Sequence, residues 1–183
     1  MKKYILDLTL TANEHLRAGY ALLKLTHEQP LPEMCPGQFA ELKVEGSETT
    51  FLRRPISINY VDEEKNEVWF LIHEIGDGTR NLGAMEVGDK LNVVMPLGKG
   101  FTMPSSGDEK VLLVGGGVGT APLLFMGRDG EAWLSANFFI GRPFGGRLDA
   151  VGHVQGIGGC VYHDRGRFRG GERFCNAAFR AAT

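Results

Sequence analysis

The chain has 183 residues, a formal net charge of -2 and 43% hydrophobic residues, which allows one ordinary domain, or one domain and part of another. The weakly acidic balance gives no reason to expect nucleic acid as a partner, and no apolar run is long enough to cross a bilayer. The N-terminus leads into alternating residues instead of a signal-peptide core, so we expect a soluble, cytoplasmic protein. The three cysteines, Cys35, Cys160 and Cys175, are too few and too scattered to predict a disulfide framework or a metal site.

The first hundred residues contain short segments of alternating polarity separated by turn residues. The segment after Pro36-Gly37 shows this pattern, and we expect Phe39, Leu42 and Val44 on or near one face. Many short strands at this spacing predict a small antiparallel β-barrel. The predicted strands cover residues 4–10, 20–26, 38–44, 50–60 and 68–73, followed by a turn and a strand over 87–94.

The strand over 50–60 carries the motif Arg53-Arg54-Pro55-Ile56-Ser57-Ile58. Arg54 offers a fixed fork of donors for a phosphate, and Pro55 biases Arg54 towards an extended backbone. Ser57 offers a hydroxyl small enough to lie against a flat ring. These properties suit an anionic, planar cofactor. Taken by itself, the hexapeptide is explained more simply by an edge strand with a solvated arginine pair.

A break at Gly76–Thr79 follows the strand over 68–73, and Thr79 is predicted to cap a short helix through Leu82. A helix start at Gly78 and Thr79 presents backbone N–H groups and a hydroxyl to an anion. An ordinary turn is the simpler interpretation of these four residues on their own.

The strand over 68–73 returns after a polar hairpin loop, so Leu71, Ile72 and His73 are predicted to neighbour Arg54–Ser57 across the sheet. With the helix start they would hold a pyrophosphate and flank an isoalloxazine ring. For the His73 side chain, a satisfied surface histidine is the simpler interpretation. Trp69 and Phe70 are predicted to be core residues.

The pattern changes after Lys110. The continuous apolar run Val111–Val114 predicts a strand buried on both faces, and the glycine-rich turn after it leads into a helix start at Leu123–Met126. Strand, glycine turn and helix in this order form the opening of a nucleotide-binding α/β unit. Thr120 stands where the third glycine of G-x-G-x-x-G would be.

Five motifs in this order and spacing resemble the ferredoxin-reductase superfamily, and within it the branch of the electron-transfer subunits of NAD-dependent dihydroorotate dehydrogenases. The R-P-I-S form, in place of the usual R-x-Y-S, is characteristic of that branch. The resemblance covers residues 1–126. The motifs are Pro36-Gly37-Gln38-Phe39, Arg54-Pro55-Ile56-Ser57, Gly76-x-Gly78-Thr79, Pro96-Leu97-Gly98-x-Gly100-Phe101 and Gly115-Gly116-Gly117-Val118-Gly119-Thr120-Ala121-Pro122.

The resemblance implies an FAD-binding β-barrel over residues 1–104, followed at 109–126 by the start of an NAD-binding α/β domain. No acid–base residue is assigned, because hydride transfer needs none. The residues implied for FAD are Arg54, Pro55, Ile56, Ser57, Leu71, Ile72, His73, Gly78 and Thr79. Those implied for NAD are Gly115, Gly116, Gly117, Val118, Gly119 and Thr120.

In the family, electrons pass between NADH, FAD and a [2Fe–2S] cluster, to or from the FMN of a dihydroorotate dehydrogenase catalytic subunit in pyrimidine biosynthesis. The expected assembly is a heterotetramer. The family holds its cluster with a C-x4-C-x2-C…C motif, which this sequence does not contain. Two alternatives stay open: a related NAD(P)H-dependent flavoprotein subunit of the sulfide dehydrogenase or ferredoxin:NADP oxidoreductase type, and an FAD-binding module without activity.

Composition changes sharply after Met126. Residues 1–126 hold all 8 lysines and 17 acidic residues, whereas residues 127–183 hold no lysine, 8 arginines, 5 acidic residues and 12 of the 26 glycines. This composition without apolar periodicity predicts a poorly ordered tail. A disordered tail and a lineage-specific end are the plain interpretations.

A sharper hypothesis is that residues 127–183 are read in a displaced frame. Shifted translations of the codons for Ser135–Arg142 and Val161–Phe179 include sequences that resemble consecutive stretches of the family's NAD domain. The slip is placed near Met126–Arg128. Nucleotide sequence across the codons for Phe125–Gly130 tests the hypothesis, and an open, unshifted frame with no family-like continuation would reject it.

Overall fold

The computed structural model describes residues 2–17, 19–103, 112–129, 137–141, 161–164 and 167–170. The chain forms two compact units, residues 1–101 and residues 102–183. Within the described ranges, no helix is long and apolar enough to span a bilayer.

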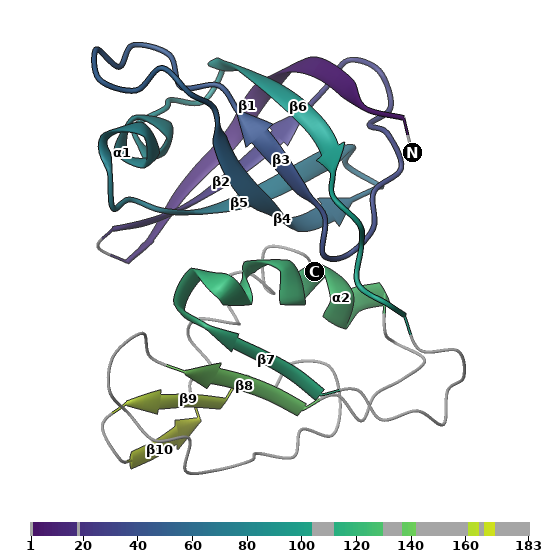
Figure 1. The fold of residues 1–183 in the computed structure, drawn as a ribbon, viewed down its shortest axis with the longest axis vertical. Helices are drawn as coiled ribbons and strands as arrows, with labels where there is room; N and C mark the ends of the chain where they lie inside the picture. Colours follow the sequence, from purple (N-terminus) through teal and green to yellow (C-terminus); the bar gives the residue numbers. More distant parts are fainter. Residues whose placement is uncertain are drawn as a thin grey trace. The chain divides into compact units, whose positions relative to one another are not determined.

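The first unit is a closed barrel of six strands, as Figure 1 shows. The order around the barrel is β1-β2-β5-β4-β3-β6, β6 returns to pair with β1, and all neighbouring pairs are antiparallel. This confirms the predicted small antiparallel barrel. The strands are β1 (Tyr4–Arg17), β2 (Tyr20–Thr26), β3 (Phe39–Leu42), β4 (Arg54–Asp62), β5 (Glu67–His73) and β6 (Lys90–Leu97).

The neighbouring strands β2 and β5 supply much of the core. Residues 20–25 of β2 and 68–72 of β5 are buried without interruption. Both faces of these strands are covered, because the inner face lines the barrel and helix α1 (Asp77–Gly83) packs against both strands. Trp69 is fully buried with Phe70, which confirms both as core residues. The ammonium of Lys24 lies 4.3 Å from the centroid of the Trp69 ring.

Strand β1 is longer than predicted and ends at Arg17 instead of residue 10. Its polar second half still pairs with β2, with register shifts after Leu10 and after His15. Asn13 helps to hold this half of the strand in place. Its side-chain amide donates to two backbone carbonyl oxygens next to the end of α1, each at 2.8 Å. Pairing and a side-chain contact with distant backbone thus override the polar pattern of this segment.

In β3 the predicted grouping of Phe39 with Leu42 on one face is wrong. Ala40 and Leu42 are the fully buried residues, and Phe39 is only half-buried. Successive strand residues point to opposite sides, so residues three apart lie on opposite faces.

The predicted short helix after β5 is confirmed as α1. Its capping residue is Gly76, with an extended backbone, so the prediction that Thr79 occupies the cap position is wrong. Thr79 is the third helical residue. Its hydroxyl accepts from the Gly76 N–H at 3.1 Å and donates to the Gly76 carbonyl oxygen at 3.0 Å, closing the first turn from inside the helix.

The second unit contains a four-stranded sheet in the order β10-β9-β8-β7. Strands β7, β8 and β9 are parallel, and β10 is antiparallel to β9. The predicted succession of strand, glycine turn and helix is present after residue 111. The elements are β7 (Leu112–Gly116), the 3-10 helix η1 (Gly117–Thr120), α2 (Ala121–Asp129), β8 (Asn137–Gly141), β9 (Val161–Asp164) and β10 (Arg167–Gly170).

The side chains of Val111–Val114 are not among those that the structure describes, so their predicted burial stays a prediction. The predicted poor order of residues 127–183 concerns a segment that is described only at the end of α2 and in β8, β9 and β10. The remainder lies outside the described residues, so this prediction and the displaced-frame hypothesis stay predictions.

Candidate functional site

The two adjacent arginines of the central motif have different surroundings. Arg53 crosses from β3 to β6: its guanidinium donates to the Glu41 carbonyl oxygen at 3.2 Å, to the Asn92 carbonyl oxygen at 3.0 Å and to the Asn92 side-chain oxygen. Asn92 donates in turn to the Asp7 carboxylate at 2.6 Å. Arg53 is therefore a structural side chain of the barrel wall, and the expectation of a solvated arginine pair is wrong for it.

Arg54 begins β4 and keeps its charge available. Its Nε and Nη2 donate to a single backbone acceptor, the Leu52 carbonyl oxygen, at 3.2 and 3.1 Å. It forms no ion pair with any carboxylate in the part of the chain that the structure describes. A guanidinium held by one neutral acceptor is suited to bind an anion.

The first turn of α1 lies directly against Arg54. A Cβ atom built on Gly78 would lie 3.3 Å from Arg54 Cδ and 2.9 Å from Thr50 Cγ2, so only glycine fits without displacing these side chains. The structure therefore brings Arg54 together with Gly78. The first turn of a helix leaves N–H groups without helical acceptors. A cation and backbone donors thus meet at one place.

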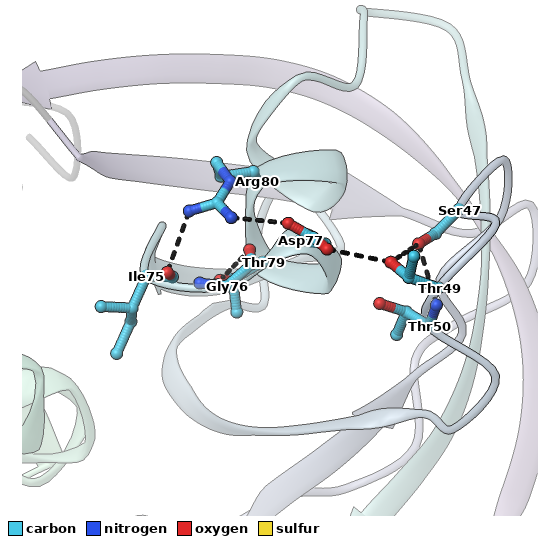
Figure 2. A network of polar contacts seen from close by, with 8 residues as sticks. All are labelled: Ser47, Thr49, Thr50, Ile75, Gly76, Asp77, Thr79 and Arg80. Carbon is cyan, nitrogen blue, oxygen red and sulfur yellow. Dashed lines mark hydrogen bonds and ion pairs between the residues drawn. The ribbon is translucent and has the colours of Figure 1, made fainter.

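Figure 2 shows a polar network on the same turn. Asp77 accepts from Arg80 at 2.6 Å and from the Thr49 hydroxyl at 2.9 Å. Ser47 accepts from the Thr50 N–H at 3.0 Å. The hydrogen bond from Arg80, the hydrogen bond from Thr49 and the positive charge of Arg80 lower the pKa of the Asp77 carboxyl below its ordinary value.

Sequence reasoning missed this network. The spacing of Asp77 and Arg80 on a helix indicates an ion pair, but nothing in the sequence pointed to Thr49.

The N-terminal half of β4 pairs with β3 alone. Ser57 is registered with Phe39 and Arg54 with Leu42, whereas the β4–β5 register begins only at Ile58 opposite Phe70. The Ile58 N–H donates to the β3 side, to Gln38 at 3.0 Å. Backbone direction alternates along a strand, so the N–H of Ser57 points to the β5 side, beyond the last registered pair.

Pro55 points its ring nitrogen in the same direction as the Ser57 N–H. Because proline has no N–H, it leaves no donor unpaired where the β4–β5 ladder has ended. The Pro55 side chain is exposed, and those of Ile56 and Ser57 are half-buried. This short stretch of β4 therefore has a side on which a ligand can replace the missing strand partner.

Strands β4 and β5 are neighbours, but their register pairs Ile58–Asp62 with Glu67–Phe70. The predicted neighbourhood of Leu71, Ile72 and His73 with Arg54–Ser57 therefore stays a prediction. Leu71 and Ile72 are buried core side chains, so only their backbone is offered to a ligand. His73 is half-buried and its ring stacks on Tyr20, with centroids 4.2 Å apart and an interplanar angle of 12°. The ring thus has a packing partner while His73 stays partly exposed, so the interpretation of a satisfied surface histidine stays in place.

The two motifs at Pro36–Phe39 and Pro96–Phe101 form one joint at the end of β6. The Phe101 N–H donates to the Pro36 carbonyl oxygen at 2.8 Å. Gln38 is fully buried; its side-chain oxygen accepts from the Cys35 N–H at 2.9 Å. A Cβ on Gly37, which has φ +90°, would lie 2.7 Å from the Phe101 nitrogen, so the turn requires glycine. These residues build the barrel. They are not among Arg54, Thr50 and Gly78, which meet at the first turn of α1 and form the Arg54 cluster.

The glycine turn belongs to the second unit. Gly115 and Gly116 end β7, and Gly117, Val118, Gly119 and Thr120 form η1 before α2. Val118 and Gly119 are exposed, and Thr120 is half-buried. This places the predicted NAD residues at the carboxyl end of a parallel strand, where α/β sheets bind ligands.

A cavity of about 450 Å³ lies elsewhere on the barrel and contains none of the predicted site residues. Its charged side chains have local partners: Lys43 pairs with Glu45 at 2.7 Å, and Lys90 donates to Thr9 at 2.7 Å. The described residues contain no group of three or more His, Cys, Asp or Glu side chains arranged to hold a metal ion. The Arg54 cluster is therefore the better candidate site.

No family model matches the chain. The chain is similar to the dihydroorotate dehydrogenase B (NAD(+)) electron transfer subunit of Shouchella clausii, with 47% identity over 94 residues, which is 51% of this chain and 36% of the relative. The protein of the same description from Caldanaerobacter subterraneus is 34% identical over 145 residues, which is 79% of this chain and 55% of the relative. The chain thus spans between about a third and about half of the length of these relatives.

Solved structures show the same fold. A ferredoxin reductase in carbazole 1,9a-dioxygenase matches 78% of this chain and 44% of its own, with a TM-score of 0.68 and 23% identity. An NADH-dependent reduced ferredoxin-NADP oxidoreductase matches 74% of this chain and 48% of its own, with a TM-score of 0.64 and 25% identity. The chain is therefore a homologue of the electron transfer subunits of dihydroorotate dehydrogenase B, with a barrel of the ferredoxin-reductase type.

Proposed function

We propose that the barrel binds FAD at the Arg54 cluster. The observation that supports this most is the contact between Arg54 and Gly78, because it places a guanidinium without a carboxylate partner against the first turn of α1. Arg54 and the backbone of Gly78 and Thr79 would hold the pyrophosphate. The stretch of β4 without a registered partner on β5 runs from Arg54 to Ser57.

The isoalloxazine ring would lie along the stretch of β4 that has no registered partner on β5. Ser57 would offer its hydroxyl and its backbone N–H to the ring edge, and Leu71–His73 would flank it through their backbone and the His73 ring. FAD, when bound, supplies the hydride and electron chemistry, whereas the protein supplies position and electrostatics. No side chain is assigned to move a proton.

We further propose that the protein acts as an electron-transfer flavoprotein subunit in the cytoplasm, exchanging electrons with NADH at the Gly115–Thr120 turn. Its partner would be a dihydroorotate dehydrogenase catalytic subunit with FMN, in a heterotetramer that serves pyrimidine biosynthesis. This rests on the identity to the electron transfer subunits. The three cysteines of the sequence do not form the family's cluster motif, so no residue here is assigned to a [2Fe–2S] cluster.

A second candidate is a subunit of another NAD(P)H-dependent flavoprotein, of the sulfide dehydrogenase or ferredoxin:NADP oxidoreductase type. The structural likeness to the NADH-dependent ferredoxin-NADP oxidoreductase supports this second candidate. Addition of a purified dihydroorotate dehydrogenase catalytic subunit separates the two. A stable complex supports the first candidate. If no complex forms but NADH still reduces the flavin, the second candidate is supported.

The test of FAD binding is retention of flavin by the complete 183-residue chain after gel filtration. A yellow protein that NADH bleaches near about 450 nm supports both the FAD site and the NAD site. A yellow protein that NADH does not bleach limits the function to an FAD-binding module. A colourless protein that takes up no added FAD contradicts the proposed function.

A further inference from the structure

The loop between β3 and β4 contacts α1 at two adjacent points. The Thr49 hydroxyl donates to Asp77 Oδ2 at 2.9 Å, and Thr50 is the side chain nearest to a Cβ built on Gly78, at 2.9 Å. Figure 2 shows both loop residues beside the first turn of the helix. Two consecutive residues of the loop thus face two consecutive residues of α1, so the loop is held along the helix and not at a single point.

The same loop holds the guanidinium of Arg54. Leu52, three residues after Thr49, provides the carbonyl oxygen that accepts from both Nε and Nη2 of Arg54. The side chains of Thr50 and Arg54 both lie close to the position that a Cβ atom on Gly78 would occupy. A displacement of the loop would therefore move the carbonyl oxygen that orients the Arg54 guanidinium.

Asp77 is the point where the helix holds the loop. Its carboxylate is a negative charge in the first helical turn, where it would repel a phosphate if it were uncompensated. Arg80 pairs with it at 2.6 Å and also donates to the Ile75 carbonyl oxygen at 2.9 Å. Both members of the pair are more than half exposed, so the pair contributes little to the folding free energy. Its consequence is local: the carboxylate is neutralised and turned towards Thr49.

We propose that Thr49 and Asp77 are positioning residues of the FAD site, which clasp the 46–52 loop onto α1 so that Arg54 is held at the correct distance from the helix. The inference rests on the proposed function. Neither residue is expected to touch FAD. Both are expected to act through Arg54, and this separates the proposal from a general effect on stability.

The test uses the complete chain and equilibrium dialysis against FAD. Thr49→Val removes the hydroxyl while keeping the shape of the side chain, and we expect FAD to bind about three- to tenfold more weakly. Thr49→Ser keeps the hydroxyl, and its FAD affinity should stay within about twofold of the wild type. Melting temperatures without FAD should be equal for the three proteins, because the clasp is exposed.

A double-mutant cycle decides whether Thr49 acts through Arg54. In an Arg54→Met background, Thr49→Val should cause no further loss of FAD affinity. The matched control is Glu45→Gln, which removes the exposed Lys43–Glu45 pair at 2.7 Å in the residues just before the loop; its FAD affinity should equal that of the wild type. A wild-type chain that binds no FAD overturns the proposed function and this inference with it. FAD binding that Arg54→Met weakens but Thr49→Val leaves unchanged, or losses that add in the cycle, overturns this inference alone.

Discussion

Arg53 and Arg54 are chemically identical neighbours whose surroundings assign them to different tasks. Around Arg53, the seam between β3 and β6 is closed: the guanidinium has acceptors on Glu41 and Asn92, and Asn92 continues to Asp7. Around Arg54, the junction between the 46–52 loop and α1 is open: the guanidinium has one backbone acceptor and no carboxylate among the described residues. A satisfied guanidinium stabilises the fold, whereas an unsatisfied one is available to a ligand.

The comparison also explains why both residues must be arginine. The Arg53 fork spans two strands and reaches three oxygen atoms from two nitrogen atoms, whereas a lysine would have to reach them from a single nitrogen. Arg54 spends two of its donors on Leu52 and retains the rest of its fork. Loss of Arg53 should therefore lower stability, whereas loss of Arg54 should weaken FAD binding.

The largest effect is expected at Arg53. Replacement by methionine leaves the acceptors on Glu41 and Asn92 without their donor, so the free energy of unfolding should fall by about 2–4 kcal/mol. Urea denaturation of the FAD-free chain measures it. FAD affinity of the molecules that remain folded should stay near that of the wild type, and a selective loss of FAD affinity at unchanged stability would contradict the division.

Arg54→Met should show the opposite behaviour. We expect FAD to bind about 10- to 100-fold more weakly, because a charge-assisted contact to phosphate is lost. The free energy of unfolding without FAD should change by less than about 1 kcal/mol, since Arg54 is bonded to one partly exposed carbonyl. Equal FAD affinity in the Arg54→Met protein and the wild type would remove Arg54 from the site.

The two buried glycines of α1 provide a matched pair for the open junction. Gly78→Ala places a Cβ 2.9 Å from Thr50 Cγ2 and 3.3 Å from Arg54 Cδ, so the loop must move. We expect a loss of FAD affinity of about five- to 20-fold, from the usual cost of overpacking. Gly83→Ala meets mainly the flexible end of Glu74, which can turn aside, and should leave FAD affinity unchanged. Equal losses in both variants would indicate a general effect on α1.

The smallest effect is the acid sensitivity of the junction. The pKa of Asp77 is lowered from 3.8 in the folded protein, so its ionised form stabilises the fold above that value, and this contribution is lost as the pH falls through the lowered pKa. Asp77→Asn should therefore lose less stability than the wild type between about pH 5 and pH 2.5. Urea midpoints at the two pH values measure the difference, and identical losses would contradict the Arg80 and Thr49 contacts.

Alternation and turn residues were sufficient to predict the barrel, its hairpin and α1, because burial of one face imposes a period of two on strands with an open face, such as β3. The order of the motifs was sufficient to predict that Arg54 and Gly78 lie close together. The different tasks of Arg53 and Arg54 were not predictable, since they depend on which strand each extended residue faces. The Thr49–Asp77 contact joins residues 28 positions apart that have no shared pattern, so only the folded chain reveals it.

The most direct test of the central claim compares FAD with riboflavin, which has the same ring but no phosphate, on the complete chain. If Arg54 and the first turn of α1 hold the pyrophosphate, FAD should bind at least about 10-fold more tightly than riboflavin, and Arg54→Met should remove most of that preference. Arg53→Met should keep the preference in its folded fraction. Equal affinities for FAD and riboflavin in the wild type, or a preference that Arg54→Met leaves intact, would contradict the assignment of the site.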